Sequence, residues 1–309
     1  MTELAFLKMH GAGNDFVVLD GLSSPLPDTF DFAAAALSLC APHFGIGADG
    51  LLLLAPSDAD AALAGAQVRM RMWNPDGSED MCGNGLRCVA QLAYARGHVS
   101  SRNFIVQTRA GLRAAEVLPD GRVRVAMGHP QFDRAAIPMQ RPGDDAGHGD
   151  DAGPDDDADA IEYSLRVAGA HIPHVTSLST GSTHTVIFTD GIVDEATFTQ
   201  LSPLIEQHAW FPERTSILWA CVEDTRHLRL RIWERGVGET LACGTGACAA
   251  AVAAQVTGRC GEHVAAASRG GVLEIEWRPG SEIFMTGPAQ SVFSGQTKEN
   301  TSWRPVSMP

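Results

Sequence analysis

The sequence predicts an α/β (α+β) chain made of two similar domains, each a strongly curved sheet wrapped around one long helix. A segment that reads Cys-Gly-x-Gly and continues into a small-residue apolar stretch occurs twice, at 82–97 and at 243–258. Around it, each half of the chain holds many short stretches of the kind that form strands. One long apolar helix among many short strands favours a sheet that curves around the helix.

The two Cys-Gly-x-Gly segments each predict a helix that begins beside a thiol. Cys82 and Cys243 come directly before the predicted helices, and Gly97 and Gly258 follow 15 residues after them, where a left-handed C-cap is expected. Free N–H groups and the positive end of the helix dipole bind anions and lower the pKa of a thiol. We therefore expect two reactive thiols and two anion-binding helix ends.

Further segments repeat in the same order, about 160 to 170 residues apart. They pair 69–73 with 229–233, 108–112 with 268–272, and 11–21 with 181–191. The last pair aligns without a gap and places His184 opposite Asn14. The repeats indicate a duplicated domain with a pseudo-two-fold axis, which would place Cys82 opposite Cys243.

The predicted elements suggest where the two domains end. The first takes residues 1–131 and the second 161–287, and we expect the tail 288–309 to return to the first domain. Between them, 132–160 is an insertion rich in Asp, Gly, Pro and Ala that we expect to be disordered because it has almost nothing to bury. A calcium-binding interpretation of its Asp cluster lacks regular ligand spacing.

Composition narrows the classes of function. The net charge is −14, and half of it comes from the acidic insertion, so the remainder is too weakly charged to suggest a nucleic-acid or anionic-membrane partner. We find no apolar run of about 18 to 20 residues and no secretory signal. Seven cysteines without a C-x-x-C pair suit a reducing compartment. We expect a cytoplasmic protein with a small-molecule amino-acid substrate. The sequence does not decide whether the protein is a monomer or a homodimer.

The other motifs of the sequence do not indicate a cofactor-binding or metal-binding site. Residues 45–50 match G-x-G-x-x-G, but they follow a predicted helix and precede a predicted strand, the reverse of a dinucleotide site. His171 and His174 have no third ligand nearby, so we interpret them as structural. Lys8 and Lys298 lie near the termini and outside any phosphate-binding context, which disfavours pyridoxal phosphate.

Two thiols that face each other across a bound amino acid can remove the α-proton from one face and deliver a proton to the other. The substrate carboxylate gains negative charge on the way, and two helix N-termini would stabilise it. Glu234 precedes the second cysteine turn and could carry its proton, and the alignment with Asn14 gives His184 a functional role. Cys88 and Cys248 lie inside their helices and are expected to be structural. A redox dithiol is the alternative from another class.

These residues resemble the diaminopimelate epimerases. The blocks that carry the resemblance are 11–16, 45–49, 74–78 with 81–85, and 233–246, which span nearly the whole chain outside the insertion. The resemblance implies two barrel-like halves around central helices, a site in the cleft between them, and cofactor-independent conversion of LL- to meso-diaminopimelate for lysine and peptidoglycan. It implies Cys82 and Cys243 as the acid–base pair with His184 and Glu234 as proton partners. The implied substrate contacts are the backbone of Gly83, Asn84, Gly244 and Thr245, and the side chains of Asn14, Asn74 and Arg235.

The chain departs from the family pattern at two positions of the distal substrate site. Ser182 and Ser216 stand where the family usually has asparagines that hold the distal amino-acid group. The reacting end is intact, so epimerase or racemase chemistry is the firmer prediction. A racemase of another amino acid that uses the same two thiols is therefore the second hypothesis.

Overall fold

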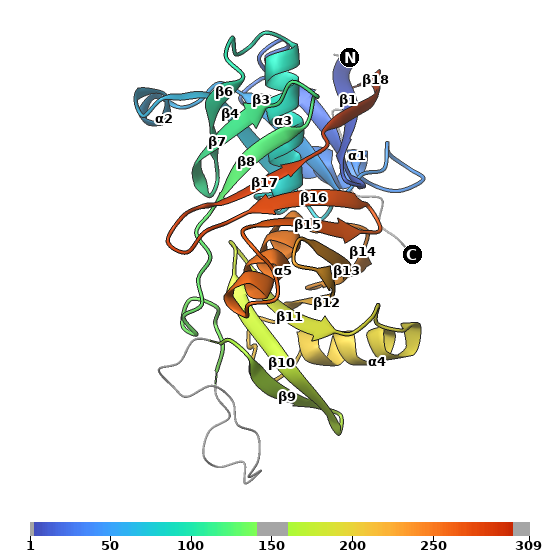
Figure 1. The fold of residues 1–309 in the computed structure, drawn as a ribbon. Helices are drawn as coiled ribbons and strands as arrows, with labels where there is room; N and C mark the ends of the chain where they lie inside the picture. The colour runs from blue at the N-terminus through green and yellow to red at the C-terminus, as the bar shows by residue number, and fades with distance from the viewer. Residues whose placement is uncertain (1–2, 141–159, 299–309) are drawn as a thin grey trace. The chain divides into compact units, whose positions relative to one another are not determined.

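The computed structural model describes residues 3–140 and 160–298, and the chain divides into two compact units (Figure 1). The first unit contains Met1–Ala126 and Thr286–Pro309, and the second contains Met127–Met285. The C-terminal segment from Thr286 therefore belongs to the first unit. The two points at which the chain passes from one unit to the other lie within strands β8, Val123–Gly128, and β17, Ile283–Gly287.

The first unit is a mixed sheet in which two neighbouring strand pairs run parallel. Its pairs are antiparallel except β2 with β3 and β4 with β6. Besides β8, the strands are β1 Glu3–Gly11, β2 Asn14–Asp20, β3 Gly50–Ala55, β4 Ala66–Trp73, β5 Glu79–Asp80, β6 Asn103–Thr108, β7 Gly111–Val117 and β18 Gln290–Lys298.

The second unit repeats this topology. Its described pairs are antiparallel except β11 with β12 and β13 with β15, which stand where β2/β3 and β4/β6 stand in the first unit. The same order of strand directions in both halves confirms the predicted duplication of the fold. The strands are β9 Tyr163–Val167, β10 Ala170–Ser179, β11 Thr183–Thr189, β12 Ser216–Asp224, β13 His227–Glu234, β14 Gly238–Thr240, β15 His263–Ser268 and β16 Gly271–Glu276.

Each sheet encloses one long helix. Helix α3, Gly83–Ala95, contacts β1, β2, β3, β4 and β7, and helix α5, Gly244–Val256, contacts β10 to β13, β15 and β16. A helix that contacts strands from across one sheet is surrounded by it, which confirms the curved sheet around a central helix. In each helix, ten of the thirteen residues are buried, and this explains why small residues are frequent in α3 and why Ala and Gly form most of α5.

The two central helices begin and end in the same way. A Cβ atom at Gly85 would lie 2.9 Å from Leu52, and one at Gly246 would lie 2.8 Å from Leu218, so both first turns need a glycine for close packing. At the other end, Gly97 and Gly258 both have φ of 73°, which confirms the predicted left-handed caps.

Three shorter helices complete the units. The first unit contains α1, Phe32–Leu39, and α2, Ala59–Leu63, and the second contains α4, Glu195–Glu206. Asp31, Asp58 and Asp194 cap them by accepting a hydrogen bond from a backbone N–H group in the first turn. The 45–50 segment connects α1 to β3, so it has the reverse order of a dinucleotide-binding turn, as the sequence predicts.

The strand register corrects the alignment of 11–21 with 181–191. Leu52 and Leu218 are equivalent because each packs on the second glycine of its Cys-Gly-x-Gly segment, and their strand partners are Val18 and Val186. The gap-free alignment is therefore wrong by two residues.

With the corrected register, Asn14 is equivalent to Ser182, and His184 is equivalent to Phe16. The error arises because similar glycines stand at different points of two turns. Gly11 pairs with Asn14 at the end of β1, whereas Gly181 lies in the turn between β10 and β11.

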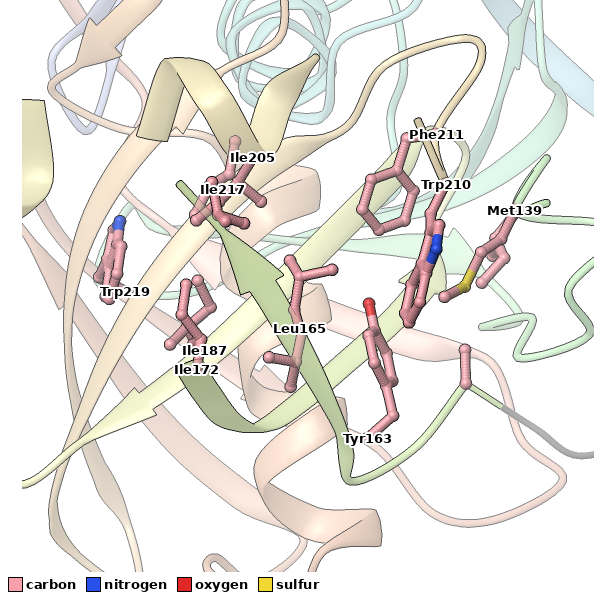
Figure 2. Packing of buried hydrophobic residues seen from close by; sticks show 14 of the residues in the cluster. Met139, Tyr163, Leu165, Ile172, Ile187, Ile205, Trp210, Phe211, Ile217 and Trp219 are labelled. Atoms are coloured by element: carbon pink, nitrogen blue, oxygen red, sulfur yellow. The ribbon is translucent and has the colours of Figure 1, made fainter. Parts of the chain in front are cut away.

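The expectation for 132–160 is also wrong at the described ends of that segment. Ile137, Met139 and Ala160 are buried in the core of the second unit, where Met139 packs in the cluster that contains Tyr163 and Trp210 (Figure 2). The few apolar residues at the borders of an acidic segment are enough to fix those borders to a core. Residues 141–159, which include the Asp cluster, lie outside the described residues.

Candidate functional site

Cys82 occupies the N-cap position of α3, and its thiol contacts the hairpin of β1 and β2. Its backbone is extended, with φ of −134° and ψ of 124°, and its side chain does not cap the helix. The Sγ atom donates a hydrogen bond to Oδ1 of Asn14 at 3.4 Å. Asn84, in the first turn of α3, donates to the same oxygen at 3.2 Å. Three predicted site residues, Cys82, Asn14 and Asn84, thus meet at one oxygen atom.

Asp49 fixes the orientation of the Asn14 amide. The Oδ2 atom of Asp49 accepts hydrogen bonds from Nδ2 of Asn14 at 2.7 Å and from the backbone N–H of Asp15 at 3.0 Å. The amide nitrogen is therefore held toward Asp49 and the amide oxygen toward Cys82. Sequence reasoning did not assign Asp49 a role, although the 45–49 block that contains it supported the family resemblance.

Asn74 lies in the turn between β4 and β5 that leads to Cys82. Its side chain donates to Oγ of Ser78 at 3.1 Å, and its backbone N–H donates to the Ser78 carbonyl at 2.8 Å. Asp76 accepts from the Ser78 backbone at 2.8 Å. All of these bonds stay within one Asn-Pro-Asp-Gly-Ser turn, so this turn is closed by its own residues.

Cys243 occupies the same position on α5 as Cys82 on α3. Its backbone has φ of −130° and ψ of 114°, and its Sγ atom lies 3.4 Å from Oγ1 of Thr245. The Glu234 carboxylate interacts with the thiol, and the Thr240 hydroxyl donates to Oε1 of Glu234 at 2.5 Å. The predicted residues Cys243, Glu234 and Thr245 therefore form one cluster in the second unit.

The expectation of a lowered thiol pKa is wrong for Cys243. Burial raises the pKa of this thiol well above its ordinary value of 9.0, and the negative charge of Glu234 raises it further. Hydrogen bonds from Thr245 and from the Gly246 backbone act in the opposite direction, but desolvation has the larger effect. Cys243 is only 8% exposed, so it is a protonated thiol at neutral pH in this structure.

His184 is a buried, neutral histidine beside Ser182. Its Nε2 atom lies 3.1 Å from Oγ of Ser182. Burial lowers the pKa of His184 from 6.5 to about 3, and the positive charge of Arg235 adds to this effect. Its Nδ1 atom is buried and has no hydrogen-bond partner among the described residues. A neutral imidazole with an open nitrogen can accept or pass on a proton.

Ser216 and Arg235 meet beside His184. His184 on β11 and Ser216 on β12 are partners in the parallel ladder, and Oγ of Ser216 accepts a hydrogen bond from the Arg235 backbone at 3.1 Å. The Arg235 guanidinium donates to the Glu213 carbonyl at 2.9 Å. No carboxylate in 3–140 or 160–298 forms an ion pair with it, so it keeps donors for an anionic ligand.

The titration of His184 predicts how stability depends on pH. Because the folded-state pKa lies below the unfolded-state value, unfolding takes up a proton between about pH 6.5 and pH 3, so the free energy of unfolding falls as the pH falls through this window. We expect His184→Gln to reduce this slope by up to about 1.4 kcal/mol per pH unit. Denaturant titrations at pH 7, 6 and 5 measure it, with His171→Gln as an exposed control. Equal slopes for wild type and His184→Gln would contradict the burial argument.

The remaining sequence-based expectations concern residues outside these clusters. Cys88 and Cys248 are fully buried in α3 and α5, and burial raises the pKa of Cys88 to about 12. His171 and His174 are exposed, and His174 bonds to Glu162 at 2.7 Å. Within the described ranges, no group of three or more His, Cys, Asp or Glu is arranged to hold a metal ion. None of the helices in these ranges has the length and apolarity needed to cross a membrane.

Comparison with known proteins gives the family. The model of the diaminopimelate epimerase family matches residues 6–133 and 176–292, which include every residue of the two cysteine clusters. The chain belongs to the diaminopimelate epimerase family. A diaminopimelate epimerase of Desulforudis audaxviator is 45% identical over 95% of this chain and 99% of its own length. One of Pelotomaculum thermopropionicum is 42% identical over 94% of this chain and 98% of its own length.

Solved structures of other proteins share the fold of this chain. A hydroxyproline epimerase from Agrobacterium vitis, with bound trans-4-hydroxy-L-proline, has a TM-score of 0.64 at 15% identity, with 95% of this chain and 92% of that chain covered. A Bacillus anthracis protein of the phenazine biosynthesis PhzF family has a TM-score of 0.63 at 15% identity, with 96% and 100% covered. At this identity the likeness concerns the fold, which is the α/β fold that the sequence predicts.

Proposed function

We propose that this chain is an isomerase that converts LL-diaminopimelate to meso-diaminopimelate without a cofactor, in the biosynthesis of lysine and peptidoglycan. The observation that carries the proposal is a pair of equivalent cysteines, each at the N-terminus of a buried helix, in a chain of the diaminopimelate epimerase family. Relatives that are 42% and 45% identical over nearly their whole length carry this name. All seven cysteines are free thiols, which supports a reducing, cytoplasmic location.

The α-proton of an amino acid is very weakly acidic, so the first task of the site is to stabilise the carboxylate as negative charge builds up on it. The N–H groups of Gly83 and Asn84 and those of Gly244 and Thr245 lie in the first turns of α3 and α5, and the N–H that bonds to the Cys243 thiol is that of Gly246. They are therefore available as donors. Such preorganised donors in a site that excludes water supply a large share of the rate enhancement.

The second task is to move two protons. One cysteine takes the α-proton as a thiolate, and the other delivers its thiol proton to the opposite face, so that the two thiols exchange protonation states in each turnover. Burial and Glu234 keep Cys243 protonated, which suits it to begin as the proton donor. Cys82 then acts as the base. In this structure it donates its S–H to the amide oxygen of Asn14, which Asp49 holds in place, so it must release that proton to solvent before it can take the α-proton. Glu234 and His184 serve as proton partners of the pair.

The distal amino-acid group of the substrate needs its own contacts. We assign these to Asn74, to Ser182 and Ser216, and to Arg235, whose guanidinium can bind a carboxylate through two N–H groups. Each serine is shorter than the asparagine usual in the family and is occupied here, Ser182 with His184 and Ser216 with the Arg235 backbone. Because these two positions depart from the family pattern, a racemase acting on another amino acid is the second candidate.

An isotope experiment tests the two-base reaction. LL-diaminopimelate is incubated with the enzyme in D2O under initial-rate conditions, without added cofactor, and both stereoisomers are recovered. We expect solvent deuterium at the inverted α-carbon of the product and little in the recovered substrate, because each thiol serves one face. Comparable label in both isomers would point to a single base, and no inversion of diaminopimelate would contradict the proposed substrate.

A further inference from the structure

Glu206, at the end of α4, is a buried carboxylate that is fully engaged with the hairpin carrying Glu234 and Arg235. It is 5% exposed, so its charge is costly unless hydrogen bonds compensate the lost water. Its Oε2 atom accepts a hydrogen bond from the indole N–H of Trp233 at 2.7 Å, and its Oε1 atom accepts one from the backbone N–H of Gly236 at 2.8 Å.

These two bonds bracket the two site residues. Trp233 directly precedes Glu234, and Gly236 directly follows Arg235, so a single carboxylate fixes both sides of the Glu234–Arg235 dipeptide. The tip of the hairpin is otherwise exposed, with Val237 at 73%. An exposed tip has few contacts of its own, so an anchor from another element has a large effect on its position.

Glu206 also reaches the segment that carries Ser216. The Arg214 guanidinium approaches Oε1 of Glu206 at 3.4 Å, and the backbone N–H of Thr215 donates to the Glu206 carbonyl at 3.3 Å. Arg214 has a φ of 62°, a conformation that is unfavourable for a residue with a side chain and needs support from its surroundings. Glu206 thus contacts both the segment before Ser216 and the hairpin that carries Arg235. These two segments meet where Ser216 accepts the Arg235 backbone N–H.

Among the described residues of the first unit, the position equivalent to Glu206 carries no carboxylate. Cys40 stands ten residues before Gly50 as Glu206 stands ten before Ser216, and Gly50 and Ser216 are equivalent in the parallel ladders. Cys40 is a buried thiol and offers no carboxylate. The β4–β5 turn, which corresponds to the β13–β14 turn, is closed by its own Asp76. The first hairpin is instead held from a distance by a cation, because the Arg109 guanidinium donates to the Glu79 carbonyl in β5.

We propose that Glu206 is a positioning residue that holds Trp233 and Gly236, and through them Glu234 and Arg235, in the geometry that the reaction needs. The inference rests on the proposed function for the roles of Glu234 and Arg235. Its first test, Glu206→Gln, keeps the shape of the side chain but leaves one acceptor atom instead of two. The amide must then face an N–H donor with its own NH2 group, so the segment has to shift. A shift of about 1 Å at reacting groups can cost about 10²-fold in rate.

Two measurements on Glu206→Gln separate this inference from the proposed function. Amide hydrogen exchange, followed by mass spectrometry, needs no substrate, and we expect peptides that contain 233–237 to exchange faster than in wild type. For inversion of diaminopimelate we expect kcat/KM to fall by about 10²-fold. Unchanged exchange in a folded variant would overturn the inference, whereas faster exchange in an enzyme that never inverts diaminopimelate would overturn only the function.

Ser202→Ala is the matched control. Ser202 lies on the same helix, is fully buried, and accepts the indole N–H of Trp219 at 2.9 Å, so its side-chain bond goes to β12 and not to the β13–β14 hairpin. This variant removes a buried bond between α4 and the sheet and should change kcat/KM by less than about threefold. A loss equal to that of Glu206→Gln would show that any weakening of α4 impairs the enzyme, and the positioning role would be wrong.

The double variant Glu206→Gln with Trp233→Phe provides a rescue test. Phenylalanine keeps an aromatic ring but has no N–H donor, so the glutamine can turn its NH2 group toward the ring and keep its oxygen on the Gly236 N–H. We expect kcat/KM and exchange protection to recover at least part of the loss seen in Glu206→Gln. A double variant that is no better than Glu206→Gln alone would indicate a need for the charge itself and would overturn positioning through Gly236.

Discussion

Replacing Cys82 or Cys243 by Ala is expected to lower the rate of inversion by several orders of magnitude. Each thiol serves one face of the α-carbon, and a general acid or base step contributes about 10² to 10⁴. In the described part of the chain, the other five cysteines lie away from helix N-termini: Cys88 and Cys248 are buried inside their helices, Cys40 is the C-cap of α1, Cys221 lies in β12 and Cys260 follows α5. The measurement is the rate of conversion of LL- to meso-diaminopimelate by each purified variant.

Cys88→Ala and Cys248→Ala are the matched controls, since they remove a thiol from the same two helices. We expect them to keep most of the activity and to lose on the order of 1 kcal/mol of unfolding free energy. A folded Cys88→Ala enzyme as inactive as Cys82→Ala would show that the wrong cysteine of α3 has been assigned.

The double variant Ser182→Asn with Ser216→Asn is expected to raise kcat/KM for diaminopimelate by up to about 10²-fold, mainly through a lower KM. A hydrogen bond to a charged group contributes roughly 1.5 to 3 kcal/mol, and both serines are too short to reach as far as an asparagine amide. At position 216 the asparagine oxygen can still accept the Arg235 backbone N–H, so the hairpin keeps this bond.

A panel of L-amino acids, assayed with wild type, both single variants and the double variant, decides between the two candidate substrates. We expect diaminopimelate to be the best substrate of wild type because Arg235 can still bind its distal carboxylate. A wild-type enzyme that inverts another amino acid much faster, and acts on diaminopimelate only once both asparagines are restored, would establish the second hypothesis.

Much of the fold was predictable because its signals are local. The Cys-Gly-x-Gly segments and the glycines at 97 and 258 mark the beginning and end of the central helices, and the structure places them there. The repetition of these signals predicted the duplication. Register was harder to predict, because the short turns after β1 and β10 hold their glycines at different points, and a two-residue shift keeps the same side chains facing the core.

The parts of the site that could not be predicted depend on contacts between distant residues. A helix N-terminus in the sequence suggests a lowered thiol pKa, but the burial that raises the pKa of Cys243 comes from the whole unit packed around it. Likewise, the roles of Asp49 and Glu206 follow only from the folded chain. Folding brings Asp49 to Asn14, 35 residues away in sequence, and Glu206 to Trp233, 27 residues away. No short sequence motif contains both residues of either pair.

The different ways in which the two hairpins are closed place different evolutionary constraints on the two copies of the duplicated domain. In the first copy, the turn carries its own closing carboxylate, so mutations at the end of α1 can accumulate without reaching it. In the second copy, the closing carboxylate lies 27 residues before Trp233 in sequence, so selection must conserve Glu206 and Trp233 together. Homologous chains should therefore accept other small apolar residues at position 40, which is buried in the core, and retain an acidic residue at position 206 wherever position 233 is tryptophan. The two copies of the domain would therefore differ in how strongly selection constrains the helix end that precedes the second strand of the parallel pair.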